Sequence, residues 1–66
     1  MSSVTDLKKL GLPAETEELF RRLEIYCIED FLAAVSVDYV AESLCVLAGW
    51  PREYLESLVA TAKLLV

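Results

Sequence analysis

Apolar residues recur along the chain at the three- and four-residue spacing of amphipathic α-helices, and the pattern gives no convincing strand. Glycine and proline divide it into segments. Gly11 and Gly49 each follow an apolar run, and Pro13 and Pro51 each precede the next one. Because glycine readily ends a helix and proline fits the first turn of the following helix, the pattern predicts a helix, a tight turn and a new helix at both places.

The first half of the chain is predicted to form three helices. A short first helix should end at about Leu10, with Ser3 or Thr5 as the N-cap whose hydroxyl accepts a bond from a free backbone N–H. A second helix is expected over residues 13–22, with glutamates in its first turn and arginines in its last. Residues 24–27 form a connection that could pass for a short strand, and a third helix follows. The inward-facing positions of the second and third helices are Thr16, Leu19, Phe20, Leu23, Ile28, Phe31 and Leu32.

The second half is predicted to form two longer helices. Ser36 is the expected N-cap of a fourth helix over residues 37–48. A fifth helix is expected over residues 51–65, beginning with its proline. The inward-facing positions of these two helices are Val37, Val40, Ala41, Leu44, Ala48, Leu55, Leu58, Val59, Ala62 and Leu65.

The fourth helix carries more apolar side chains than one inner stripe requires. Tyr39, Val46 and Leu47 lie outside that stripe, so the helix is either central or in contact with another molecule. The whole chain shows the same surplus, because 56% of its residues are hydrophobic and its mean hydropathy is +0.46. A short chain has a large surface for its volume, so some of these side chains must face outward. Such a surface usually marks self-association or partner binding.

These elements predict an all-α fold in which residues 1–66 form a single helical domain. With only short turns between segments, we expect a compact orthogonal bundle of about five short helices. A chain of 66 residues has room for one core and little else.

The charge balance disfavours nucleic acid as a partner. The chain has 6 basic and 11 acidic residues and a net charge of −5, whereas binding to a phosphate backbone relies on clustered lysine and arginine. The basic pairs, Lys8 with Lys9 and Arg21 with Arg22, are more simply explained as partners of helix C-termini.

Catalytic and metal-binding chemistry also lack a basis in the sequence. The chain has no histidine, and no serine or cysteine has an obvious base partner, so we expect no enzymatic activity and no small-molecule substrate. Cys27 and Cys45 lack zinc-ligand spacing, so no metal or other cofactor is expected. Both lie among apolar neighbours and are interpreted as buried, reduced thiols, which favours a cytoplasmic location. No run reaches the about 18 apolar residues of a membrane-spanning helix, and the N-terminus lacks a signal peptide pattern.

One run of the chain, DLKKLGLPAETEELFRRLEIYCIEDFLAA, resembles the helix-hairpin-helix unit in the C-terminal domain of the bacterial RNA polymerase α-subunit and in related small domains of unknown function. Residues 12–25 are similar to the second helix of that unit, and residues 28–32 to its third. The run VAESLCVLAGWPREYLESLVATAKLL is similar to the second half of the related domains. The hydrophobic spacing is shared with sterile-alpha-motif domains, whose opening is similar to the run LGLPAETEELF. The resemblance implies a SAM-like helical fold over nearly the whole chain.

The DNA-binding features of that family are altered here. A DNA-binding hairpin needs a glycine-rich turn whose backbone N–H groups approach a phosphate, and here Gly11 remains while Pro13, which has no N–H, fills the other position. Where the polymerase domain has an arginine that reaches DNA, this chain has Glu15. The resemblance therefore implies the fold without the DNA function.

The leading hypothesis is a small acidic protein–protein interaction module that docks on another protein or forms a homo-oligomer. Aromatic side chains are favoured anchors at interfaces. The expected protein-binding residues are Trp50, Tyr54, Tyr39 and Val46. Trp50 fits equally well as a lid on the core at the turn before the last helix, and Tyr26 and Phe31 are expected to pack in the core.

Two alternatives remain open. A nucleic-acid-binding hairpin would make its contacts through Gly11, Lys8 and Lys9, although net charge and the altered turn disfavour it. An acidic domain shaped like a polymerase domain could also compete for the partners of that domain.

Overall fold

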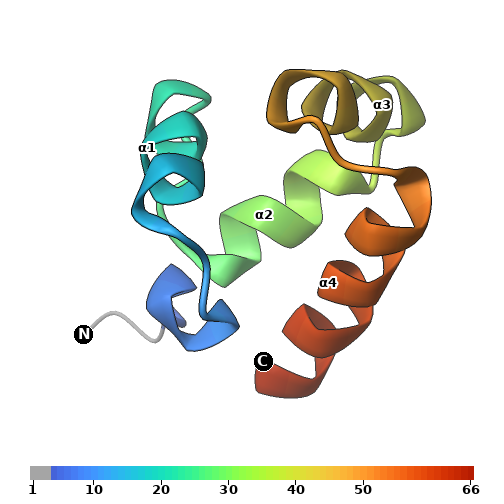
Figure 1. Cartoon of the computed structure of the whole chain (residues 1–66). Coiled ribbons are helices and arrows are strands. Elements are labelled where there is room, and N and C mark those ends of the chain that lie inside the picture. Colours follow the sequence, from blue (N-terminus) through green and yellow to red (C-terminus); the bar gives the residue numbers. More distant parts are fainter. Residues whose placement is uncertain (1–3) are drawn as a thin grey trace.

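The computed structural model describes residues 4–66, and helices make up most of that part of the chain (Figure 1). The elements are the 3-10 helix η1 (Leu7–Leu10) and the α-helices α1 (Ala14–Arg22), α2 (Ile28–Val35), α3 (Asp38–Ala48) and α4 (Arg52–Leu65). No β-strand occurs within these residues, although a single antiparallel bridge pairs Asp6 with Cys27. The predicted all-α class is confirmed, and the first predicted helix is a 3-10 helix.

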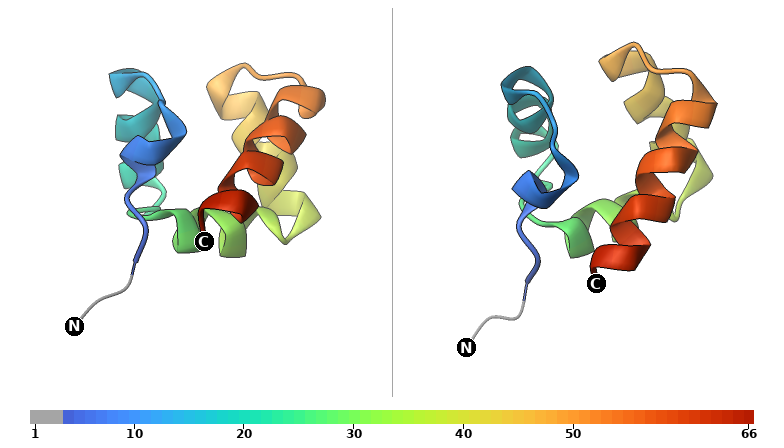
Figure 2. Two further views of the ribbon diagram at one scale, coloured as in Figure 1. Left: turned by 90° about the horizontal axis from the view of Figure 1, so that it is seen from below. Right: turned by 60° about the horizontal axis from the view of Figure 1, so that its bottom comes forward.

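In Figure 1 the short helix α2 lies between η1 and α1 on one side and α3 and α4 on the other, and Figure 2 shows it along one face of the molecule, where it links the two groups. It contacts both α3 and α4, and those two helices also contact each other. The last part of α4 contacts η1, so the C-terminal end of the chain packs against its first helix. Each helix therefore has at least one side turned toward a common centre.

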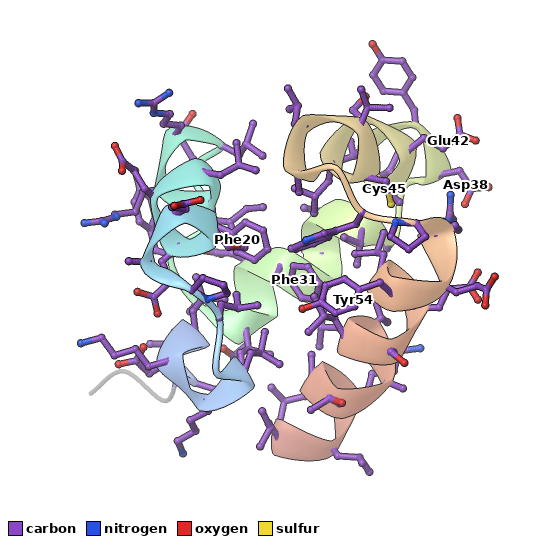
Figure 3. The ribbon with its side chains drawn as sticks, in the orientation of Figure 1. Phe20, Phe31, Asp38, Glu42, Cys45 and Tyr54 are labelled. Carbon is purple, nitrogen blue, oxygen red and sulfur yellow. The ribbon has the colours of Figure 1, made fainter. Side chains whose placement is uncertain are left out.

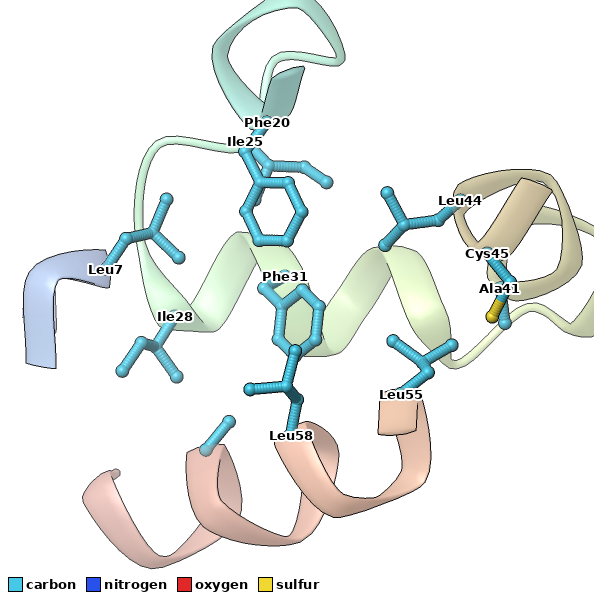
Figure 4. Packing of buried hydrophobic residues seen from close by; sticks show 11 residues of the cluster. Leu7, Phe20, Ile25, Ile28, Phe31, Ala41, Leu44, Cys45, Leu55 and Leu58 are labelled. Carbon is cyan, nitrogen blue, oxygen red and sulfur yellow. The ribbon is translucent and has the colours of Figure 1, made fainter. Parts of the chain in front are cut away.

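The core lies between these helices and is built from both halves of the chain (Figure 4). Its buried members are Leu7, Phe20, Ile25, Ile28, Phe31, Ala41, Leu44, Cys45, Leu55, Leu58 and Ala62. Phe31 on α2 and Phe20 on α1 are completely buried, and their rings stack with centroids 5.4 Å apart. The prediction that Phe31 packs in the core is confirmed. Burial of two aromatic rings is a large favourable contribution in so small a domain.

The ends of α1 and α3 have the same geometry, in which a left-handed residue reverses the chain. After α3 the residue is Gly49, with φ of 72°, as the glycine pattern predicts. After α1 it is Glu24, with φ of 62°, although its side chain makes this conformation less favourable. In both turns the next residue donates back to the helix: Ile25 N–H to the carbonyl of Phe20 at 2.8 Å, and Trp50 N–H to that of Cys45 at 2.9 Å. These bonds satisfy carbonyls that would otherwise be free.

Two predicted N-caps are wrong. Asp6 caps η1, because its Oδ1 accepts the N–H of Lys8 at 2.9 Å, whereas Thr5 bonds elsewhere and Ser3 lies outside the described residues. Ser36 belongs to the end of α2, where its hydroxyl donates to the carbonyl of Ala33 at 2.6 Å. Val37 takes the N-cap position of α3 and supplies no side-chain bond. The four α-helices therefore start within one residue of the predicted positions, whereas η1 and α3 have caps other than those predicted.

Three apolar side chains that were expected inside are exposed. Val37 precedes α3, and Leu23 follows the last residue of α1, so neither lies on the inner stripe of a helix. Tyr26 lies in the connection before α2 and is 61% exposed, which contradicts the expected core packing. The spacing of a helix does not govern these positions, because the chain is not helical there.

Thr5 is held against the beginning of α2 by a group of hydrogen bonds. The backbone N–H of Thr5 donates to Oε1 of Glu29 at 2.8 Å, and its hydroxyl lies 3.0 Å from Oε2. The N–H of Ile28 donates to the carbonyl of Thr5 at 2.9 Å. The bond from Thr5 N–H holds the pKa of the Glu29 carboxyl below its ordinary value, because it stabilises the charged form.

Candidate protein-interaction surface

The side of α3 that faces away from the core carries a cluster of exposed apolar side chains. We define the outer face of α3 as Tyr39, Glu42, Ser43, Val46 and Leu47, which together line an open depression of about 460 Å³. Tyr39 is 78% exposed, Val46 81% and Leu47 60%. Solvated apolar side chains gathered on one helix face are typical of a surface that binds a partner.

The position of the outer face follows from the helical spacing of α3. Ala41, Leu44 and Cys45 are buried against the core. Because a helix turns about 100° per residue, positions 39, 42, 43, 46 and 47 fall on the opposite side. The helix is apolar on both sides, so the expectation of a helix apolar around much of its girth is confirmed for these residues.

The charges carried by α3 are acidic. Its charged side chains are Asp38 and Glu42, which lie near each other and point away from the core (Figure 3). Asp38 lies 3.3 Å from a guanidinium nitrogen of Arg52 at the start of α4, and both groups are accessible to solvent. Glu42 has no ion pair within residues 4–66. The apolar side chains of the outer face therefore border a carboxylate without a cation partner.

Trp50 was predicted either to anchor an interface or to cover the core, and in the structure it packs against the core. Its indole meets the ring of Phe20 edge-on, with centroids 6.1 Å apart, and the ring of Tyr54 at 5.0 Å. It is only partly exposed, and Tyr54 is 42% exposed. The four predicted protein-binding residues thus fall into two pairs: Tyr39 and Val46 lie on the outer face of α3, whereas Trp50 packs on the core and Tyr54 packs against the Trp50 ring.

The residues of the nucleic-acid alternative lie together at η1. Gly11 has a φ of 67°, and its N–H donates to the carbonyl of Lys8 at 3.0 Å. This donor is used within the turn and does not point to a ligand. Lys8 and Lys9 are exposed, but Lys8 shares its depression with Asp6 and Glu17. The local field is therefore mixed, and no feature here favours a phosphate.

The cysteines and carboxylates form no chemical centre in the described part of the chain. Cys27 and Cys45 are buried and free, as the sequence predicts. Burial raises the pKa of the Cys27 thiol, whose sulfur accepts the N–H of Asp30 at 3.4 Å and caps α2. Across residues 4–66, no three histidine, cysteine, aspartate or glutamate side chains are grouped as metal ligands.

No single helix within residues 4–66 is both long enough and apolar enough to cross a bilayer. The pair α2 and α3 has the required length and apolar composition only when the two helices are counted together, and the chain bends by 113° between them.

The predicted binding residues omit Leu47, which the sequence places off the inner stripe, and the two polar residues of the outer face, Glu42 and Ser43. The signal for Glu42 and Ser43 was available, because they lie three and four residues after Tyr39 and so on the same side of a helix. Both side chains are polar, and the expectation that aromatic and apolar side chains anchor an interface does not include them.

Comparisons with protein-family models, with curated proteins and with solved structures give no match to this chain.

Proposed function

We propose that this protein is a small acidic protein–protein interaction module without catalytic activity, and that it binds through the outer face of α3. The observation that carries the proposal is the exposure of Tyr39, Val46 and Leu47 on one side of one helix. An aromatic ring beside two branched aliphatic side chains offers the kind of apolar anchor that protein interfaces bury.

The proposal includes the helix-hairpin-helix, SAM-like arrangement that the sequence resembles. The order of η1, a left-handed glycine turn, α1 and α2 supports it. It also includes a cytoplasmic location, which is supported by the two cysteines being free and buried. In this proposal the chain uses its helices as a scaffold that presents α3.

The test is site-specific photocrosslinking in cells of the source organism. A photoreactive amino acid replaces Val46 on the outer face, and in a matched protein it replaces Leu64, which is 87% exposed on α4. We expect a discrete protein adduct from position 46 and none of comparable yield from position 64. The mass of the adduct distinguishes a second copy of this chain from a different protein.

A second substitution shows whether the adduct depends on the surface itself. Leu47→Ser, introduced beside the photoreactive group at position 46, should remove most of the adduct, while Leu64→Ser should leave it unchanged. Circular dichroism confirms that both variants stay helical. Equal labelling from positions 46 and 64, or an adduct insensitive to Leu47→Ser, would mean that α3 is not the binding surface.

A further inference from the structure

The outer face of α3 continues onto α1. A second open depression is lined by Glu15, Thr16 and Leu19 of α1 together with Leu47 and Ala48 of α3. Leu47 borders both depressions. We call the combined surface the α1–α3 strip, and it consists of Glu15, Thr16, Leu19, Tyr39, Glu42, Ser43, Val46, Leu47 and Ala48.

Carboxylates border the α1–α3 strip on both helices. Glu42 lies on the α3 part and Glu15 on the α1 part, and both are exposed without an ion pair in the region that the structure describes. On α1, Arg22 shares a depression with Glu15, but it lies 3.4 Å from Glu18 in an ion pair. The strip itself contains no basic residue. Its field is therefore negative on both sides of the apolar centre at Leu47.

This charge pattern disfavours a second copy of the chain as the occupant. If two strips met face to face, the carboxylates of one copy would approach those of the other, and each copy carries a net charge of −5. Like charges brought together at an interface are costly. A partner with positive charge on each side of an apolar stripe instead meets favourable charges across the whole strip.

On the basis of the proposed function, we propose that the α1–α3 strip binds a basic amphipathic helix of another protein. Apolar side chains of that helix cover Val46 and Leu47, and its lysine or arginine residues face Glu42 and Glu15. An amphipathic helix fits because its apolar stripe, flanked by charged positions, matches a shallow apolar surface with a charged rim. The charges contribute mainly to the choice of partner and to the rate of encounter.

The inference is tested with two synthetic helices and the full chain. One peptide has leucine on one face and lysine on the other, and its counterpart has glutamate in place of lysine. Fluorescence anisotropy of the labelled peptides measures binding. We expect the lysine peptide to bind and the glutamate peptide not to bind. Leu47→Ser combined with Val46→Ser should weaken binding about tenfold or more, since both anchors lose their apolar contact.

Charge variants separate recognition at the strip from general attraction to an acidic protein. Glu42→Gln and Glu15→Gln should each weaken binding of the lysine peptide about threefold, as expected for an exposed ion pair. Glu17→Gln is the matched control, because Glu17 lies in the same turn of α1 but lines the depression beside Lys8 and Arg21. It should leave binding unchanged.

Different failures have different meanings. Equal weakening by Glu17→Gln and Glu42→Gln would overturn the inference, because binding would reflect net charge alone. Equal binding of both peptides would overturn it too, although the proposed function would stand. Sedimentation equilibrium showing a dimer that Val46→Ser dissolves would assign the strip to a second copy. The absence of a protein adduct from position 46 in the otherwise unchanged protein would instead contradict the proposed function itself.

Discussion

At the scale of single residues, the stacked rings of Phe20 and Phe31 are the centre of the core. Phe31 is completely buried on α2, the helix that contacts both α3 and α4. Replacing it with leucine removes the ring contact at 5.4 Å and leaves unfilled volume. We expect Phe31→Leu to lower the free energy of unfolding by about 1–2 kcal/mol. Urea denaturation followed by circular dichroism measures it.

The matched control is Tyr26→Leu, a change of an aromatic residue at a position that is 61% exposed. An exposed substitution of this kind should change the free energy of unfolding by less than about 0.5 kcal/mol. A larger effect at Tyr26 than at Phe31 would contradict the assignment of the core.

A second prediction concerns the carboxyl group of Glu29. The N–H of Thr5 lowers its pKa in the folded protein, so the charged form is favoured by folding. The stability that this group contributes is present above its unfolded pKa, and it is lost as pH falls through the lower folded pKa. We expect the carboxyl carbon of Glu29 to titrate in NMR spectra with a midpoint below 4.5, its ordinary value.

Two variants check the cause of that shift. Proline at position 5 removes the N–H that donates to Glu29, so Thr5→Pro should move the midpoint back toward 4.5. Thr5→Val keeps the N–H and removes only the hydroxyl bond, so it should have the smaller effect. An unchanged midpoint in Thr5→Pro, with the fold intact, would show that another group causes the shift.

Single residues also show where sequence reasoning reaches its limit. The burial of Phe31 follows from its place on a helical stripe, whereas the connection that holds Tyr26 has no period from which to infer a direction. The same holds for Trp50, which follows a glycine turn. Its two roles, lid and anchor, both suit an aromatic residue, and only the contact with Phe20 at 6.1 Å decides between them.

At the scale of helices, the two left-handed turns differ in how well their residue suits the conformation. Glu24 carries a side chain at φ of 62°, where glycine is favoured, and Gly49 already has the favoured residue. We expect Glu24→Gly to raise the free energy of unfolding by about 0.5–1 kcal/mol and Gly49→Ala to lower it by about 1 kcal/mol. Thermal unfolding of both proteins provides the comparison.

Two controls separate backbone effects from other causes. Glu24→Gln removes the charge but keeps the side chain, so it should not reproduce the gain of Glu24→Gly. Open space surrounds the position where a Cβ would stand on Gly49, so steric clash does not contribute to the loss in Gly49→Ala. Stabilisation by Gly49→Ala would contradict the left-handed turn.

The positions of glycine and proline made the order of the helices predictable, but the side chains that cap the helices could not be predicted. Gly11, Gly49, Pro13 and Pro51 occur at or beside helix ends because their backbones favour those positions. Ser36 misled the assignment, since a serine hydroxyl can cap a following helix or bond back to the preceding one, and here it donates to Ala33. Ser36 has helical backbone angles, with φ of −68° and ψ of −18°, whereas an N-cap residue adopts the β region.

At the scale of the whole molecule, the surplus of acidic groups affects stability. The chain carries a net charge of −5, and the ion pairs found within residues 4–66 are all exposed, so each contributes little. Like charges repel more strongly in the compact state than in the unfolded chain. We therefore expect the urea midpoint to rise as NaCl is increased to about 1 M, where the Debye length is about 3 Å.

A charge-reduced variant tests the cause. Glu24→Lys with Glu42→Lys changes the net charge by four, from −5 to −1, at two exposed positions that form no ion pair within residues 4–66. Its urea midpoint should depend less on NaCl than that of the parent. An equal salt dependence in both proteins would point to a general salt effect on apolar burial.

The candidate site was partly predictable at this scale as well. The apolar surplus of the fourth helix predicted an exposed surface, and Tyr39 and Val46 are on it. The continuation onto α1 through Leu47 could not be predicted, because it depends on which helices become neighbours in space. Residues 15 and 47 are far apart in the sequence, and no local pattern relates them.

The position of Trp50 makes the folded state visible to an optical method. It is the single tryptophan of the chain, and its indole lies between Phe20 from the first half and Tyr54 from the second. Its emission spectrum therefore reports whether the two halves have docked, and separation of the helices would shift the emission to longer wavelength as water reaches the ring. Because the indole is on the core and not on the outer face of α3, a partner that binds there would leave this signal nearly unchanged.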